Sequence, residues 1–114
     1  MKAFSRFYSF RANLQTNPVV ESVVTKEFKI KINGDFATID YNKIDDNTYD
    51  LVHSNIPKEF HGQGLGSILA QRVFDHLVQN NKKIKVSCEY LQKYFSTNRE
   101  KYKHFVVNDL NENL

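Results

Sequence analysis

The sequence has little cysteine, proline or glycine, no tryptophan and no long apolar run. Its one cysteine, Cys88, excludes an intramolecular disulfide and a cysteine-based zinc site, and a lone thiol is typical of a reducing compartment. No segment approaches the roughly 18 apolar residues that a membrane-spanning helix needs. The 114 residues contain no repeat and no linker-like tract, so we expect one domain with one core.

Acidic residues are absent from the first 20 positions, which contain Lys2, Arg6 and Arg11. The whole net charge of +3 lies in this segment, because residues 21–114 balance 13 basic against 13 acidic residues. A domain without net positive charge is not expected to bind nucleic acid.

Two interpretations of residues 1–20 stay open. The arginines, serines and aromatic residues resemble a mitochondrial transit peptide, but an ordinary N-terminus can have the same composition. We therefore divide the chain into a flexible or targeting segment over residues 1–20 and a single domain over residues 21–114. The protein is expected inside the cell, in mitochondria in the first case and in the cytoplasm or nucleus in the second. Residues 1–25 are expected to lead straight into strands.

The rest of the chain has the pattern of an antiparallel meander followed by a helix and a parallel strand, an α/β fold of α+β character. Alternating residues predict strands over residues 27–32, 36–41 and 48–56, and Asn33-Gly34 is a strong hairpin signal. The third strand should present Tyr49, Leu51, His53 and Asn55 on one face. A helix is expected over residues 65–80, a parallel strand over residues 84–88, and helical turns over residues 90–102.

A glycine-rich loop, His61-Gly62-Gln63-Gly64-Leu65-Gly66, joins the third strand to the helix. Its glycines permit a tight turn and a close ligand, and the following helix directs unpaired N–H groups at the loop. This arrangement favours a phosphate or pyrophosphate, although the spacing is neither the dinucleotide fingerprint nor the P-loop. The alternative is a sharp strand-to-helix turn without a ligand.

Residues 60–66 resemble the acyl-CoA loop of the GNAT-type N-acetyltransferases, whose pattern is Gln/Arg-x-x-Gly-x-Gly/Ala. Gly64 and Gly66 match, whereas His61 stands where Arg or Gln is usual. With residues 50–57, residues 86–90 and two later tyrosines, the chain resembles the small, truncated N-acetyltransferase domain-containing protein 1-like family from about Phe28 to Phe105. The resemblance implies a minimal GNAT-like fold, acetyl-CoA as cofactor and an unknown amine, protein or small molecule, as acceptor.

The same resemblance implies roles for individual residues. Cys88 would lie near the thioester as a transient acetyl acceptor, and His53 would be the base. A buried small apolar residue and a packed core histidine are the respective alternatives. Tyr90, Tyr94 and Tyr102 would line the CoA channel or protonate the leaving thiolate, and the alternative is that they only pack. The cofactor-binding residues would be Ile56, His61, Gly62, Gln63, Gly64, Leu65, Gly66, Tyr90 and Tyr94.

Two functions from different classes follow. The first is an acetyl-CoA-dependent N-acetyltransferase, and the second is a CoA-binding sensor or interaction module without significant turnover. The second is favoured by the truncated acceptor side and by the lack of an obvious glutamate base. The four histidines lack ligand spacing, so no metal is expected, and neither is a membrane partner. The protein is expected to be a monomer or weak dimer.

Overall fold

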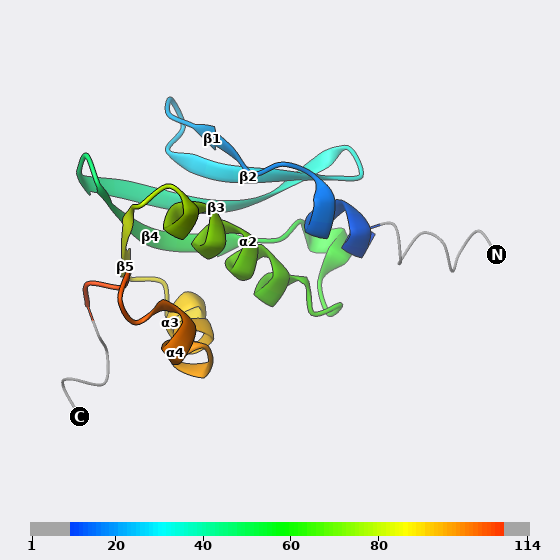
Figure 1. The fold of residues 1–114 in the computed structure, drawn as a ribbon. Helices are drawn as coiled ribbons and strands as arrows, with labels where there is room; N and C mark the ends of the chain where they lie inside the picture. Colours follow the sequence, from blue (N-terminus) through cyan, green and yellow to red (C-terminus); the bar gives the residue numbers. More distant parts are fainter. Residues whose placement is uncertain (1–9, 109–114) are drawn as a thin grey trace.

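The structure is a computed structural model in which residues 10–108 are described. A five-stranded sheet in the order β1-β2-β3-β4-β5 carries its helices on one face (Figure 1). A short helix over residues 10–16 precedes the sheet. The elements that follow are β1 (Val20–Ser22), β2 (Glu27–Ile32), β3 (Asp35–Asp45), β4 (Thr48–Asn55), a 3-10 turn (Lys58–Phe60), α2 (Leu65–Gln79), β5 (Lys83–Val86), α3 (Glu89–Thr97) and α4 (Arg99–Tyr102).

The predicted meander and parallel strand are confirmed. β2, β3 and β4 pair antiparallel, and β5 pairs parallel with β4. The β2–β3 turn consists of Asn33 and Gly34 with φ of 47° and 84°, the positive values that a two-residue hairpin turn requires. The short strand β1, which pairs with β2, was not predicted, because three residues carry no measurable alternation.

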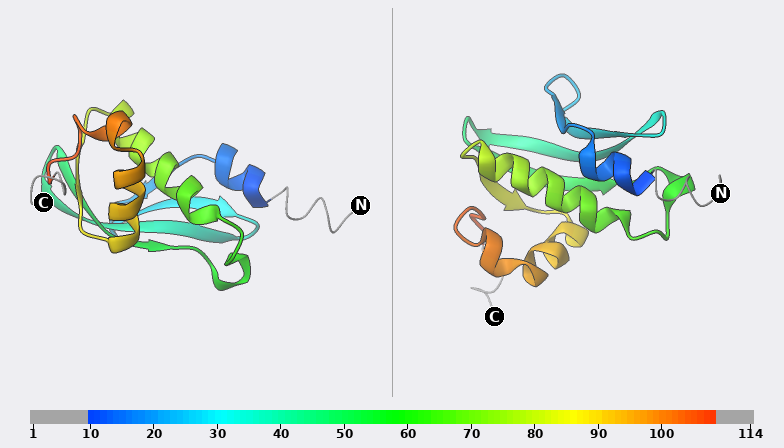
Figure 2. Two further views of the ribbon diagram at one scale, coloured as in Figure 1. Left: turned by 90° about the horizontal axis from the view of Figure 1, so that it is seen from below. Right: turned by 45° about the vertical axis from the view of Figure 1, so that its right-hand side comes forward.

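The core lies between the sheet and α2. Alternate residues of β2, Phe28, Ile30 and Ile32, are fully buried, and Leu69 and Val73 of α2 are buried too. Figure 2 shows α2 crossing the sheet, with α3 and α4 along one flank and the N-terminal helix along the other. None of the helices described within residues 10–108 is long and apolar enough to cross a membrane.

The helix over residues 10–16 is not predicted by the sequence. The expectation that residues 1–25 lead straight into strands is wrong, because residues 10–16 are helical. Leu14 is fully buried, and Phe10, one helical turn earlier, is 7% exposed. The Arg72 guanidinium of α2 donates to the Leu14 carbonyl at 2.6 Å. Residues 1–9 of the expected flexible or targeting segment lie outside the described residues.

A β-bulge in β4 changes the predicted face of His53. Asp40 of β3 pairs with His53, but the next residue, Tyr41, pairs with Leu51, so Val52 is an extra residue on β4. A bulge reverses the alternation of the strand beyond it. His53 therefore lies on the sheet face opposite Leu51, and not on the same face as predicted.

The predicted strand over residues 84–88 is shorter than expected. β5 ends at Val86, and Cys88 is the N-cap residue of α3. The backbone N–H groups of Ser87 and Cys88 both donate to the Leu51 carbonyl at 3.0 Å. The chain thus turns away from the sheet just after the last pair, Leu51 and Val86.

Candidate functional site

β4 and β5 separate before β4 ends. Their pairing stops at Leu51 and Val86, whereas β4 continues to Asn55. Among the described residues, no strand pairs with that edge of β4 over residues 52–55. Its N–H and C=O groups are therefore available to an extended ligand.

A cavity of about 420 Å³ lies at this opening. It is bounded by the end of β4, the glycine loop, the first turn of α2 and the first turn of α3. Seven of the nine predicted cofactor-binding residues line it, and only Gln63 and Tyr94 do not. The lining residues are Ser54, Ile56, Phe60, His61, Gly62, Gly64, Leu65, Gly66 and Tyr90.

The glycine loop leaves the N-terminus of α2 open. Gly62 and Gly64 have φ of 80° and 71°, which favours glycine at both positions. Gly64 is the N-cap residue, no side chain caps the helix, and its first turn contains no acidic residue. The first N–H groups and the positive end of the helix dipole are therefore not neutralised by a side chain, a geometry suited to an anion.

Gly66 and Tyr90 hold α2 and α3 together at the cavity. A Cβ at residue 66 would lie 2.7 Å from the Tyr90 hydroxyl oxygen, so the absence of a side chain lets the ring pack there. The ring remains 45% exposed. Burial raises the pKa of Tyr90, so its phenol is protonated at neutral pH.

The two histidines of this region have different surroundings. His61 Nε2 lies 2.6 Å from the Ile56 carbonyl oxygen, and a protonated Nε2 would donate to it. This contact ties the loop to the end of β4. His53 does not line the cavity: its side chain is 74% exposed on the opposite sheet face, where Nδ1 lies 3.8 Å from Asp40 Oδ2. Its predicted role as a base stays a prediction.

Cys88 does not line the cavity either. It is partly buried and packs against the core where β5 gives way to α3. It therefore lies near the opening between the strands, at the start of a helix and not at the end of the strand. Its predicted role as an acetyl acceptor stays a prediction.

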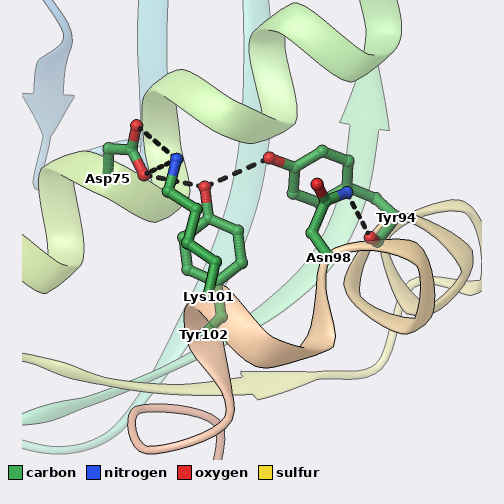
Figure 3. A network of polar contacts seen from close by, with 5 residues as sticks. All are labelled: Asp75, Tyr94, Asn98, Lys101 and Tyr102. Carbon is green, nitrogen blue, oxygen red and sulfur yellow. Dashed lines mark hydrogen bonds and ion pairs between the residues drawn. The ribbon is translucent and has the colours of Figure 1, made fainter.

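Tyr94 lines a second cavity of about 500 Å³ between α2, α3 and α4, and Tyr90 lines both cavities. Figure 3 shows the polar network beside it. The Tyr102 hydroxyl donates to Asp75 Oδ1 at 2.7 Å and lies 3.1 Å from the Tyr94 hydroxyl. Lys101 Nζ lies 3.2 Å from the same Asp75 oxygen. The network joins α3 and α4 to α2.

Both phenols of this network are protonated at neutral pH. Burial raises the pKa of Tyr94, and burial together with the Tyr94 and Asp75 hydrogen bonds raises the pKa of Tyr102 far above its usual range. Tyr94 thus has a packing role, and its hydroxyl donates to Tyr102, because the single Tyr102 proton is donated to Asp75. Its predicted role as the proton donor to the leaving thiolate stays a prediction.

Sequence reasoning missed two cavity residues, Ser54 and Phe60. The bulge at Val52 turns Ser54 toward the helices, since Ser54 pairs with the buried Ile39. Strict alternation predicts that His53, and not Ser54, lies on the same face as Leu51. No local feature of the sequence indicates the bulge. Phe60 stands directly before the glycine loop in the sequence. Only the structure shows that its side chain is buried beside the loop and lines the cavity.

The comparisons with known proteins identify the family of this chain. Residues 27–105 match the family described as GCN5-related N-acetyl-transferase. The chain is similar to Protein NATD1 of Xenopus tropicalis, with 33% identity over 75 residues that cover 64% of this chain and 69% of that protein. Protein NATD1 of Mus musculus is 31% identical over 75 residues, covering 64% and 68%.

A solved structure gives the same result. The solution structure of a protein of Staphylococcus aureus assigned to the GCN5-like N-acetyltransferases superposes with a TM-score of 0.55 at 28% identity, covering 84% of this chain and 90% of that one. The resemblance that was based on residues 60–66 and the later motifs is confirmed. The chain belongs to the GCN5-related N-acetyltransferase family.

Proposed function

We propose that this protein binds acetyl-CoA in the cavity beside the glycine loop and transfers the acetyl group to an amine. One observation carries the proposal: the uncapped N-terminus of α2 opens into the cavity at the point where β4 and β5 separate. Membership of a family of acetyltransferases supports acetyl-CoA over other phosphate-containing ligands.

Two features of the site suit two parts of this cofactor, its pyrophosphate and its pantetheine arm. The N–H groups of the loop and of the first turn of α2 would hold the pyrophosphate. The open edge of β4 over residues 52–55 would bind the extended pantetheine arm through backbone hydrogen bonds. Acetyl-CoA supplies an activated thioester, whose carbonyl needs a hydrogen-bond donor as negative charge develops.

Acetyl transfer forms a C–N bond to the amine and breaks the C–S bond of the thioester. The amine must lose a proton, and the leaving thiolate must gain one. Tyr90 and Tyr94 both carry a phenolic proton at neutral pH, and Tyr90 lines the cavity, so we assign the proton donor to Tyr90 first.

His53 and Asp40 lie side by side on the exposed face of the sheet. We propose that the amine approaches from this face and that the imidazole of His53 accepts its proton. The Asp40 carboxylate, with Oδ2 at 3.8 Å from Nδ1, lies where it would orient the imidazole.

A second function, CoA binding without significant turnover, is favoured by one specific observation. Neither His53 nor Cys88 lines the cavity, so no predicted base or acyl acceptor touches its wall. A protein of this kind would bind acetyl-CoA and act as a sensor or an interaction module.

Calorimetric titration with acetyl-CoA, with CoA alongside, tests the proposal. We expect micromolar binding of both, followed by release of free CoA when a panel of amines is added. Binding without release in the presence of any amine would support the second function. If neither ligand bound to the folded protein, the glycine loop would be only a turn and both functions would be wrong.

The Cys88→Ala variant tests the predicted acetyl acceptor. We expect its acetyl-CoA affinity to stay within a few-fold of wild type, because Cys88 does not line the cavity, and its transfer rate to fall. The readouts are calorimetry for binding and the rate of CoA release for transfer. Full activity in this variant would mean that Cys88 only packs against the core.

A further inference from the structure

The N-terminal helix lies directly beside the glycine loop. Phe10 packs against Phe60, the residue before the loop, with ring centroids 4.5 Å apart. Arg11, the next residue, extends its guanidinium to the loop itself: Nη2 donates to the Gln63 carbonyl at 3.4 Å and lies 4.0 Å from the position of a Cβ on Gly64. A positive charge thus lies next to the N-cap residue of α2.

We propose that Arg11 is a cofactor-binding residue that contacts the pyrophosphate of CoA from outside the part of the chain that matches the family, residues 27–105. This inference rests on the proposed function, since it assumes that the loop binds CoA. It assigns to the N-terminal helix a role in the site that the matched region does not supply.

The loop lacks the side chain that the acyl-CoA pattern usually supplies. His61 stands at the Arg or Gln position, and its Nε2 lies 2.6 Å from the Ile56 carbonyl, so this nitrogen is already engaged. A guanidinium suits a phosphate better than an imidazole, because it presents several N–H donors in a planar fork. Within residues 10–108, Arg11 makes one long hydrogen bond and pairs with no carboxylate. Most of its N–H donors are therefore available to a ligand.

The helix that carries Arg11 is joined by hydrogen bonds to α2, the helix that begins at the loop. Arg72 of α2 donates to the carbonyls of Leu14 and Asn17 at 2.6 and 2.8 Å. The Asn13 side chain accepts from the Asn33 N–H at 3.1 Å, which joins the same helix to the β2–β3 turn. A fixed helix places the guanidinium at the loop before the ligand arrives, so less entropy is lost on binding.

The test compares the CoA affinity of wild type, Arg11→Gln and Arg11→Lys by calorimetry. We expect Arg11→Gln to weaken CoA binding about tenfold and Arg11→Lys to weaken it less, because lysine keeps the charge but not the fork. The matched control is Lys43→Gln, which removes one exposed charge near the β3–β4 turn, at the opposite end of β4 from the loop. The control should bind CoA like wild type, and thermal melting should show all variants folded.

Dephospho-CoA, which keeps the pyrophosphate but lacks the 3′-phosphate, identifies the contact. Arg11→Gln should weaken its binding by the same factor as for CoA. A loss seen with CoA but absent with dephospho-CoA would overturn the pyrophosphate contact, and so would an Arg11→Gln variant that binds CoA like wild type. If wild type itself bound no CoA, the proposed function would be wrong, a result distinct from failure at Arg11 alone.

Discussion

Replacing Gly64 by valine is expected to lower the affinity for acetyl-CoA by about 100-fold or more, which corresponds to about 2.7 kcal/mol. Gly64 is the N-cap residue of α2 and has φ of 71°, a conformation that costs a residue with a side chain about 1–2 kcal/mol. Among residues 10–108, apart from its chain neighbours, only Arg11 Nη2 lies within 4 Å of the position of its Cβ, at 4.0 Å. Valine methyl groups would therefore fill the open space in front of the N–H groups, where the pyrophosphate is proposed to lie.

The matched control for this prediction is Gly34→Val in the β2–β3 turn. Gly34 also has positive φ, 84°, and within the described part of the chain no atom beyond its chain neighbours lies within 4 Å of its Cβ position, but it does not line the cavity. Both variants should lose stability in chemical denaturation, and only Gly64→Val should lose binding in calorimetry. A folded Gly64→Val variant with wild-type affinity would show that the loop is not the pyrophosphate site.

Replacing Leu14 by alanine is expected to destabilise the whole domain by roughly 2–5 kcal/mol, the usual cost of truncating a buried leucine. Leu14 is 0% exposed, although it lies within the first 20 residues, where a flexible or targeting segment was one interpretation. The cost follows because the N-terminal helix completes the core beside α2 (Figure 2). Urea unfolding followed by circular dichroism measures the free energy of unfolding.

Val24→Ala is the control for the leucine variant. Val24 is 94% exposed in the β1–β2 turn, and its loss should change the free energy of unfolding by no more than about 0.5 kcal/mol. If Leu14→Ala behaved like Val24→Ala, the N-terminal helix would be separable from the domain. A cleavable targeting segment that includes residues 10–16 would then be consistent with the data.

The sequence by itself determined the order of the strands β2, β3, β4 and β5 and the position of the glycine loop, because both depend on local patterns. Alternation over residues 27–32 predicts β2, and Asn33-Gly34 predicts its turn, since few residue pairs accept two positive φ values. The glycines of the loop mark a strand-to-helix turn in the same way. Together with the resemblance, they predicted nine cofactor-binding residues, seven of which line one cavity.

Only the tertiary structure decided which side chains line the cavity and which distant residues contact one another. The bulge at Val52 depends on how β3 pairs with β4, and it exchanges His53 for Ser54 on the face of the cavity. The contact of Arg11 with Gln63 joins residues 52 positions apart. Leu14 is buried because its side chain packs into the core formed by residues far along the chain, and Arg72 donates to its carbonyl. A local pattern reports the conformation of its own segment, whereas contacts between distant segments depend on the packing of the whole chain.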